Sequence, residues 1–347
     1  MSLQPFSIRG LTIDPPLVLA PMTGLTHVVL RQLISGFGGC GLFTSEMLSC
    51  RAIPHDSLKH SFLLKRLASQ RPFFYQLVGN TPEAMAKAVE HLENTVDETG
   101  QGPDGFDINF GCGAPKIRNS GSGAGLMRDT GNAARVVAAC RKITSLPLTA
   151  KIRLGWEQEK PGELTRFAQM LEDEGIDAIT LHPRLAKEKF KRRARWQYVG
   201  MIKNELRIPV IGNGDINSSG DVLKRMKETG CDGIMIGRLA ISRPWIFNVI
   251  SGAESHKSVN LKINLKELYL EFIHLLEEHF PDERRIGRLK MFTHYFAKNF
   301  KFGHNLASAV QNTENINEAA QKALSFFRLN HAECSFNLNS DNLKAQT

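Results

Sequence analysis

Residues 105–117 read GFDINFGCGAPKI, and this stretch passes from an apolar run into a loop rich in glycine. A short continuous apolar run is typical of a parallel strand that is buried on both faces. Asp107 and Asn109 lie two positions apart, so their side chains share one face of that strand. The glycines on either side of Cys112 indicate a turn that lifts the thiol beyond the end of the strand.

Similar apolar runs recur along the chain, at 17–20, 41–44, 73–78, 148–152, 178–182, 209–213 and 233–237. Amphipathic helical segments separate them. One begins with Thr81-Pro82, a cap followed by a first-turn proline, and others end at a glycine. Eight strand–helix repeats over about 240 residues predict an α/β fold of the (β/α)8 TIM-barrel type, because a doubly wound sheet usually has fewer strands.

The segments outside the barrel predict a hairpin, a small domain and a tail. FSIRGLTIDPP, residues 6–16, reads as a hairpin that could close the bottom of the barrel. After residue 250 the pattern becomes helical, without strand runs. We therefore expect a barrel domain over 1–254, a small C-terminal helical domain over 255–332 and a disordered tail over 333–347.

Composition limits the class of protein. The chain has 347 residues, of which 42% are hydrophobic, so it can bury a large core. No apolar run of about 20 residues and no secretory signal are found. Six scattered cysteines without CxxC or zinc-like spacing predict reduced thiols in a cytoplasmic protein and no structural metal. The net charge of +9 favours a polyanionic partner such as RNA or DNA, or else a merely basic enzyme.

Polar and ionisable residues occur at the ends of most predicted strands, where barrel enzymes carry their catalytic groups. Lys151 is the most informative, because a lysine inside LPLTAKI is costly to bury without a partner or ligand. Gln76 alone could cap a loop, and His182 alone could be a satisfied core histidine. Together with Asn109, Arg153 and the residues after the last two strands, they predict one functional rim.

The loops after the seventh and eighth strands indicate a phosphate site. They read GNGDINSSGD (212–221) and IGRLAISRPW (236–245). Barrels often bind phosphate at these two loops, where glycines expose backbone N–H groups and Arg238 could add charge-assisted hydrogen bonds. The alternative is that the glycines only form tight turns.

Six motifs in order and spacing make the sequence resemble the tRNA-dihydrouridine synthase family over roughly residues 15–250. They are LAPMTGLTHVVLRQL, FYQLVGNTPEAMAKA, FDINFGCGAPKI, AKIRLGW, IGNGDI and IGRLAISRPWIF. The resemblance implies an FMN enzyme that reduces specific uridines in tRNA to 5,6-dihydrouridine, with NADPH as reductant. The helical region fits the small C-terminal domain of that family.

The resemblance also implies residue roles. Cys112 matches the cysteine that gives a proton to C5 of the uracil while the flavin gives hydride to C6, and a free thiol with a pKa of about 8.5 is mostly protonated near neutrality. Asn109 resembles the residue that contacts the target base, with Lys116, Arg153 and Arg184 nearby. The implied cofactor-binding residues are Pro21, Met22, Thr23, Gln76, Lys151, His182, Asn213, Gly214, Asp215, Gly237 and Arg238. Three positions depart from the family pattern: Gly113 stands in place of proline, Pro183 in place of glycine and Leu185 in place of threonine.

Two basic segments are candidates for RNA binding. KEKFKRRAR (187–195) follows the sixth strand and includes Lys191, Arg192 and Arg193, and ERRIGRLK (283–290) includes Arg284 and Arg288. An extruded base costs a few kcal/mol, which contacts to the RNA backbone must supply. Each segment could instead be a solvated face.

Three other functions remain open from the residues. The first is an FMN-dependent reductase of a free pyrimidine or another small enone, for which the basic loop would lack a purpose. The second is a non-catalytic RNA-binding protein on a barrel scaffold. The third is a phosphate-binding aldolase that uses Lys151 as a Schiff base. No stable protein partner is inferred.

Overall fold

The computed structural model describes residues 3–55, 61–188, 191–254, 261–330 and 334–338. Its centre is a sheet of eight parallel strands in the order β3-β10-β9-β8-β7-β6-β5-β4. A bridge between Val18 and Leu42 joins the first strand to the last, so the sheet closes into a barrel. This confirms the predicted (β/α)8 fold. The strands are β3 (Leu17–Leu19), β4 (Phe43–Ser49), β5 (Phe73–Val78), β6 (Gly105–Phe110), β7 (Leu148–Gly155), β8 (Ala178–Leu185), β9 (Val210–Asn213) and β10 (Gly233–Ile236).

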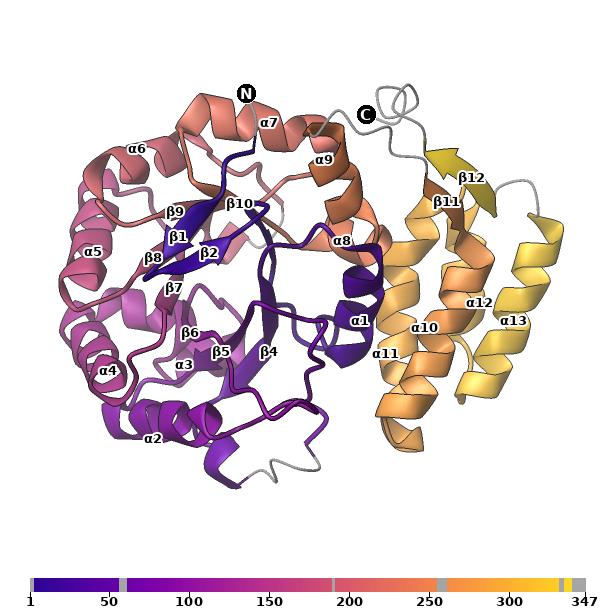
Figure 1. The fold of residues 1–347 in the computed structure, drawn as a ribbon, viewed down its shortest axis with the longest axis horizontal. Coiled ribbons are helices and arrows are strands. Elements are labelled where there is room, and N and C mark those ends of the chain that lie inside the picture. The colour runs from indigo at the N-terminus through magenta and orange to yellow at the C-terminus, as the bar shows by residue number, and fades with distance from the viewer. Residues whose placement is uncertain (1–2, 56–60, 189–190, 255–260, 331–333, 339–347) are drawn as a thin grey trace.

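Helices surround the barrel (Figure 1). Each turns an apolar stripe to the strands, as α4 does with Ala133, Val136, Val137 and Cys140 at three- and four-residue spacing. The helices are α1 (Val28–Phe37), α2 (Pro82–Glu93), α3 (Pro115–Asn119), α4 (Thr130–Ile143), α5 (Pro161–Asp173), α6 (Gln197–Glu205), α7 (Ser219–Thr229), α8 (Arg238–Ser242) and α9 (Ile246–Glu254). Short 3₁₀ turns are η1 (Ile53–His55), η2 (Gly123–Arg128) and η3 (Ala186–Glu188).

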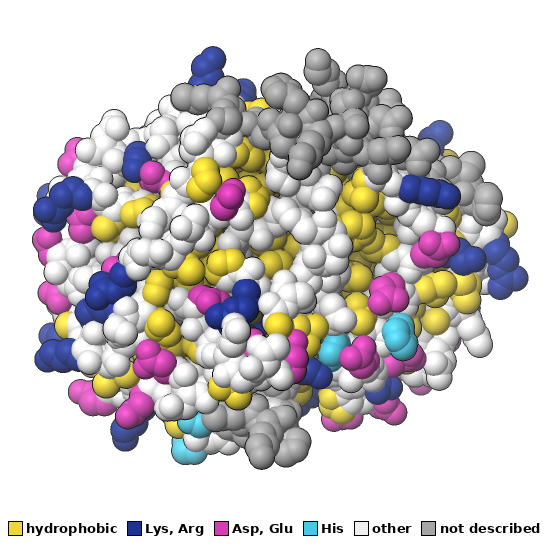
Figure 2. Space-filling model, viewed as in Figure 1, with side chains coloured by type: hydrophobic (Ala, Val, Ile, Leu, Met, Phe, Trp, Pro, Cys, Tyr) yellow, Lys and Arg dark blue, Asp and Glu magenta, His cyan; other side chains and the backbone are white. Residues whose placement is uncertain are grey.

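The N-terminal hairpin closes one end of the barrel. β1 (Phe6–Ile8) pairs antiparallel with β2 (Leu11–Ile13), and the turn has positive φ at Arg9 (48°) and Gly10 (84°). Ile8 and Ile13 are fully buried in a cluster with residues of β3, β5, β8, β9 and β10. On this face, which the hairpin covers, basic and acidic side chains are interspersed (Figure 2), so the net charge of +9 is not concentrated there. The hairpin does not cover the opposite end of the barrel, where the strands finish and where barrel enzymes bind their ligands.

The C-terminal region packs beside the barrel around an aromatic core. Tyr269 donates or accepts a 2.6 Å hydrogen bond with Thr293, and the rings of Phe272 and Phe292 stack at 3.8 Å between centroids. The elements are β11 (Leu261–Asn264), α10 (Leu265–His279), α11 (Asp282–Phe296), η4 (Ala297–Asn299), α12 (Gly303–Gln311), α13 (Ile316–Leu329) and β12 (Ser335–Leu338). In the chain, α10 packs on α1, and α11 packs on α8 (Figure 1).

Two expectations for this region need correction. A two-stranded sheet is present, because β11 pairs antiparallel with β12, and residues 335–338 are therefore a strand instead of a disordered tail. The buried Cys334 anchors the strand, and its carbonyl accepts a 2.7 Å hydrogen bond from the backbone N–H of Leu265. The rest of the expected tail, 339–347, and the start of the expected helical domain, 255–260, lie outside the described residues. Among the described helices, none is both long and apolar enough to cross a bilayer.

Candidate active site

The middle of β7 and the end of β9 bring a lysine and an asparagine together in the mouth of the barrel. Lys151 Nζ donates a 3.1 Å hydrogen bond to Asn213 Oδ1, and Asn213 Nδ2 donates to the carbonyl of Met235 at 2.8 Å. Burial lowers the pKa of Lys151 to about 8, with a further lowering from Arg153 and an opposing effect from Asp107. The ammonium group is therefore poised to pair with an electron-rich ligand.

Asp215 holds two arginines at the same mouth. Both carboxylate oxygens accept from Arg184 Nη2 at 2.5 Å, and one accepts from Arg238 Nη2 at 3.2 Å. Burial raises the pKa of Asp215, but hydrogen bonds from the Ala194 N–H and from Arg184 outweigh it and hold the pKa below its usual range. The carboxylate thus positions cations. A phosphate at the predicted cradle would meet Arg238 and backbone N–H groups instead of this carboxylate.

His182 contributes a neutral ring to the wall. Its Nε2 lies 3.3 Å from Arg184 Nη1. Burial, followed by the positive charges of Lys151 and Arg153, holds the pKa of His182 well below its usual value. A Cβ atom on Gly214, whose φ is +116°, would lie 2.8 Å from the imidazole, so this position requires glycine.

A chain of buried side chains crosses β5, β6 and β7 and ends at the cysteine loop. Thr149 and Gln76 each donate a 2.7 Å hydrogen bond to Asp107, and Asn109 donates to Gln76 Oε1 at 2.8 Å. Asn109 Oδ1 then accepts from the backbone N–H of Cys112 at 2.8 Å. Sequence reasoning assigned no role to Asp107 or Thr149, although the shared strand face of Asp107 and Asn109 was a usable signal. This series of hydrogen bonds fixes the backbone at the start of the cysteine loop.

The Cys112 loop lies against the rim. The Cys112 side chain is half-buried, and Arg153 Nε donates a 2.7 Å hydrogen bond to the carbonyl of Gly111, the residue before it. A Cβ on Gly113 would lie 3.2 Å from the carbonyl oxygen of Ala186 in η3. Glycine thus stands in place of the family's proline at a position where the backbone lies close to Ala186.

The turn after β3 supplies another part of the wall. Pro21 and Met22 line a cavity of about 150 Å³, whereas Thr23 is exposed. Met22 Sδ would lie 3.1 Å from a Cβ on Gly237, which keeps this turn against the start of α8. The same cavity is lined by Lys151, Arg153, His182, Arg184, Asn213, Gly214, Asp215 and Arg238. The predicted catalytic, cofactor-binding and base-contacting residues that do not line it are Thr23, Gln76, Asn109 and Cys112.

The predicted RNA-binding residues differ in exposure. Lys116 on α3, residues 191–193 after η3 and Arg284 at the start of α11 are exposed. Residues 189–190 of the basic loop lie outside the described residues. Arg288 is half-buried, with its guanidinium carbon 4.1 Å from the ring centroid of Phe280 and 5.1 Å from that of Phe62. Its stacking makes Arg288 less available to RNA than Arg284.

A buried acid next to the mouth was missed. β4 contains a bulge between Thr44 and Met47, and Glu46 within it is 3% exposed. Its carboxylate accepts the backbone N–H of Gly24, which belongs to the turn that carries Met22. Burial raises the pKa of Glu46, and the charges of Arg288 and Arg31 oppose that effect. The glutamate inside the apolar run LFTSEMLS was the signal in the sequence.

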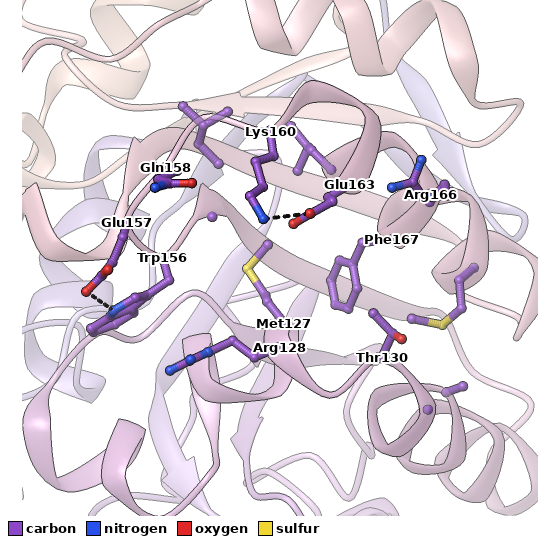
Figure 3. Close-up of a pocket in the computed structure, with 16 residues that line it drawn as sticks. Met127, Arg128, Thr130, Trp156, Glu157, Gln158, Lys160, Glu163, Arg166 and Phe167 are labelled. Atoms are coloured by element: carbon purple, nitrogen blue, oxygen red, sulfur yellow. Dashed lines mark hydrogen bonds and ion pairs between the residues drawn. The ribbon is translucent and has the colours of Figure 1, made fainter.

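A second cavity, of about 840 Å³, lies on the outer side of the rim between η2–α4 and β7–α5 (Figure 3). It is the larger of the two, yet it contains none of the residues that meet in the mouth. Because barrel chemistry is carried by inward-facing strand ends, the smaller mouth cavity is the candidate active site.

A closed barrel with an ionisable, partly desolvated rim defines an enzyme of the (β/α)8 class. Residues 18–335 match the model of the dihydrouridine synthase (Dus) family. A probable tRNA-dihydrouridine synthase of Rickettsia bellii is 33% identical over 246 residues, covering 70% of this chain and 72% of that protein. One of Aquifex aeolicus is 30% identical over 311 residues, covering 88% and 94%. The chain belongs to the dihydrouridine synthase family, whose members are flavin-dependent oxidoreductases.

Solved structures agree on the fold. Histamine dehydrogenase from Rhizobium sp. 4-9 superposes with a TM-score of 0.57 at 15% identity, covering 74% of this chain and 48% of that one. A 2-naphthoyl-CoA reductase complex gives a TM-score of 0.54 at 13% identity, covering 72% and 51%. The chain thus spans about half the length of each, and the likeness concerns the barrel alone.

Proposed function

We propose that this enzyme reduces uridines of tRNA to 5,6-dihydrouridine, with FMN as the bound flavin and NADPH as the reductant. The observation that carries the proposal is a 2.7 Å hydrogen bond that joins the mouth to the cysteine loop, in a chain of this family. Its donor is Arg153, two positions along β7 from the buried Lys151, and its acceptor is the carbonyl of Gly111, next to Cys112. A free pyrimidine is not favoured as substrate, because the relatives are named for tRNA. The six cysteines, all within the described part of the chain, form no disulfide with one another, which supports work in the reducing cytoplasm.

The residues of the mouth fit FMN. Lys151, Arg153, Arg184 and Arg238 outnumber the carboxylates Asp107 and Asp215, which suits an anionic phosphate and an electron-rich ring. Gly214 and Gly237 leave space that a Cβ atom would fill against His182 and Met22. Lys151 and Asn213 would bind the ring, and Arg238 with the backbone at Gly214 and Gly237 would hold the phosphate.

The protein's own chemistry is positioning and one proton transfer. The bound flavin supplies hydride to C6 of the uracil. The Cys112 thiol gives its proton to C5, the C5–C6 double bond becomes single, and the resulting thiolate regains a proton from solvent. Lys151 and Arg153 would stabilise that thiolate between these events, since Arg153 Nε already donates a hydrogen bond to the carbonyl of the adjacent Gly111. Asn109, fixed by Gln76, would orient the base.

RNA would lie across the rim. The exposed Lys116, the residues 191–193 and Arg284 would contact its phosphates, and their charge would offset the cost of extruding the base. Arg184 would act indirectly, because its guanidinium is committed to Asp215.

The test uses purified protein, NADPH and an unmodified tRNA transcript. We expect yellow protein that forms dihydrouridine in the transcript and does not turn over free uracil. Cys112→Ala should keep bound FMN and NADPH oxidation but lose at least about a hundredfold in dihydrouridine formation, the size typical of a lost general acid. Cys140→Ala, at a buried cysteine on α4, is the matched control. Equal dihydrouridine yields from Cys112→Ala and wild type would contradict the assigned acid, and reduction of free uracil alone would contradict the RNA substrate.

A further inference from the structure

The 840 Å³ cavity on the outer rim has an apolar floor and a cationic edge (Figure 3). Met127, Leu154 and Phe167 are among the residues that form the floor. Arg128 and Arg166 stand at its edge and have no carboxylate partner among the described residues. Lys160 is paired with Glu163 at 2.7 Å, so it contributes less net charge. An apolar floor beneath two arginines without carboxylate partners matches a ligand that has both a flat apolar part and an anion.

Trp156 gives the cavity an aromatic wall. The indole Nε1 donates a 3.1 Å hydrogen bond to Glu157, and the guanidinium carbon of Arg118 lies 4.8 Å from the ring. The side chain is partly exposed, whereas Trp196 and Trp245 are 3% and 2% exposed. Proteins that bind single-stranded RNA stack its bases on exposed aromatic side chains among basic residues, and Trp156 with its neighbouring arginines has this composition.

The cavity is separate from the reaction proposed above. Strand residues alternate in direction, so Lys151 and Arg153 face the mouth and Leu154 faces outward to the cavity. No residue lines both cavities. Its occupant is therefore not the reacting base.

The walls of the cavity are joined to both loops that border the mouth. The backbone N–H of Ala124 in η2 donates to the carbonyl of Cys112 at 3.0 Å. The N–H of Lys187, at the start of the basic loop, donates to the carbonyl of Trp156 at 3.3 Å. An RNA strand whose target base enters the mouth beside Cys112 and whose backbone follows the basic loop would pass this cavity.

We propose that this cavity is a subsite for a second, unstacked nucleotide of the RNA substrate. The base rests on the apolar floor beside Trp156, and Arg128 and Arg166 bind the adjoining phosphates. The inference rests on the proposed function and adds a second binding site for the RNA. Contacts at this site would fix how the RNA lies across the rim while the target uridine is extruded.

The experiment measures the KM for unmodified tRNA transcript with FMN-loaded full-length enzyme. Arg128→Glu/Arg166→Glu should raise that KM at least tenfold, and Trp156→Ala, which changes no charge, about fivefold or more. FMN content and NADPH oxidation without RNA should stay within twofold of wild type. The matched control is Lys142→Glu/Arg207→Glu, the same charge change at the closed end of the barrel, which should raise the KM less than twofold.

Intrinsic fluorescence gives a second readout. Because Trp156 is the partly exposed tryptophan, tRNA should quench the wild type more than Trp156→Phe. Unchanged KM for tRNA in both cavity variants, with active wild type, overturns the subsite and leaves the proposed function intact. A raised KM for NADPH in place of tRNA also overturns it, since the cavity would then hold the dinucleotide. A wild type that makes no dihydrouridine overturns the proposed function instead.

Discussion

Lys151 should make flavin binding depend on pH. Its pKa is lowered to about 8 in the free protein, first by burial and then by Arg153, so the ammonium form predominates below pH 8 and is lost above it. Since the proposed role of Lys151 is to pair with an electron-rich ring, the dissociation constant for FMN should be level below pH 7. Above pH 8 it should rise about tenfold per pH unit, as expected for one proton. Fluorescence titration of apoprotein with FMN measures it.

Lys151→Met is the control for this titration. It removes the charge but keeps the length of the side chain, so FMN should bind more weakly below pH 7 and show no break near pH 8. The same break in the variant would assign the titration to another group and remove Lys151 from the role.

The individual site residues were predictable to the extent that strand register determines them. Lys151, His182 and Asn213 follow from counting to the strand ends, and the structure brings them to one cavity. Their partners were not predictable, because hydrogen bonds join residues distant in the chain. The pairing of Arg184 with Asp215 spans 31 residues. Similarly, Arg288 was predicted to bind RNA, and only the packing of α11 shows that its guanidinium stacks on Phe280.

At the scale of the elements, the bulge in β4 leads to a prediction about the free energy of unfolding. The extra residue turns Glu46 toward Gly24 and the charges of Arg31 and Arg288, while Ser45 Oγ accepts the Gln76 N–H at 2.9 Å. Glu46→Ala removes the acceptor and the countercharge together. We expect it to lower the free energy of unfolding by about 2–3 kcal/mol. Urea denaturation of the FMN-free protein measures this.

Glu46→Gln separates the two contributions of that side chain. The amide oxygen can still accept the Gly24 N–H, but the countercharge is absent, so its loss of stability should fall between those of wild type and Glu46→Ala. Full stability of both variants would mean that neither the hydrogen bond nor the charge matters here.

Most elements were predictable because local patterns specify them. The eight apolar runs became the eight barrel strands within a few residues at each end, and the Arg9-Gly10 turn produced the hairpin. The pair β11 and β12 was not predicted. LKIN is short, and it is stabilised as a strand by pairing with residues 335–338 more than seventy positions later, which no local pattern specifies.

At the scale of the whole molecule, the excess of positive charge should act through the open end of the barrel. The face that the hairpin covers mixes both signs (Figure 2), and residues 191–193 are exposed on the loop after β8, where the strands finish. Lys191→Glu/Arg192→Glu/Arg193→Glu removes up to three phosphate contacts. Each contact contributes about 0.7–0.9 to the slope of log affinity against log salt, so the slope should become shallower by about two to three. Filter binding of tRNA from 50 to about 300 mM salt measures it.

The closed-end variant Lys142→Glu/Arg207→Glu changes the net charge without touching the rim, and its slope should stay within one of wild type. Equal slopes for the rim variant and wild type would place the RNA elsewhere on the molecule, since counterion release reports contacts made and is insensitive to which base is reduced.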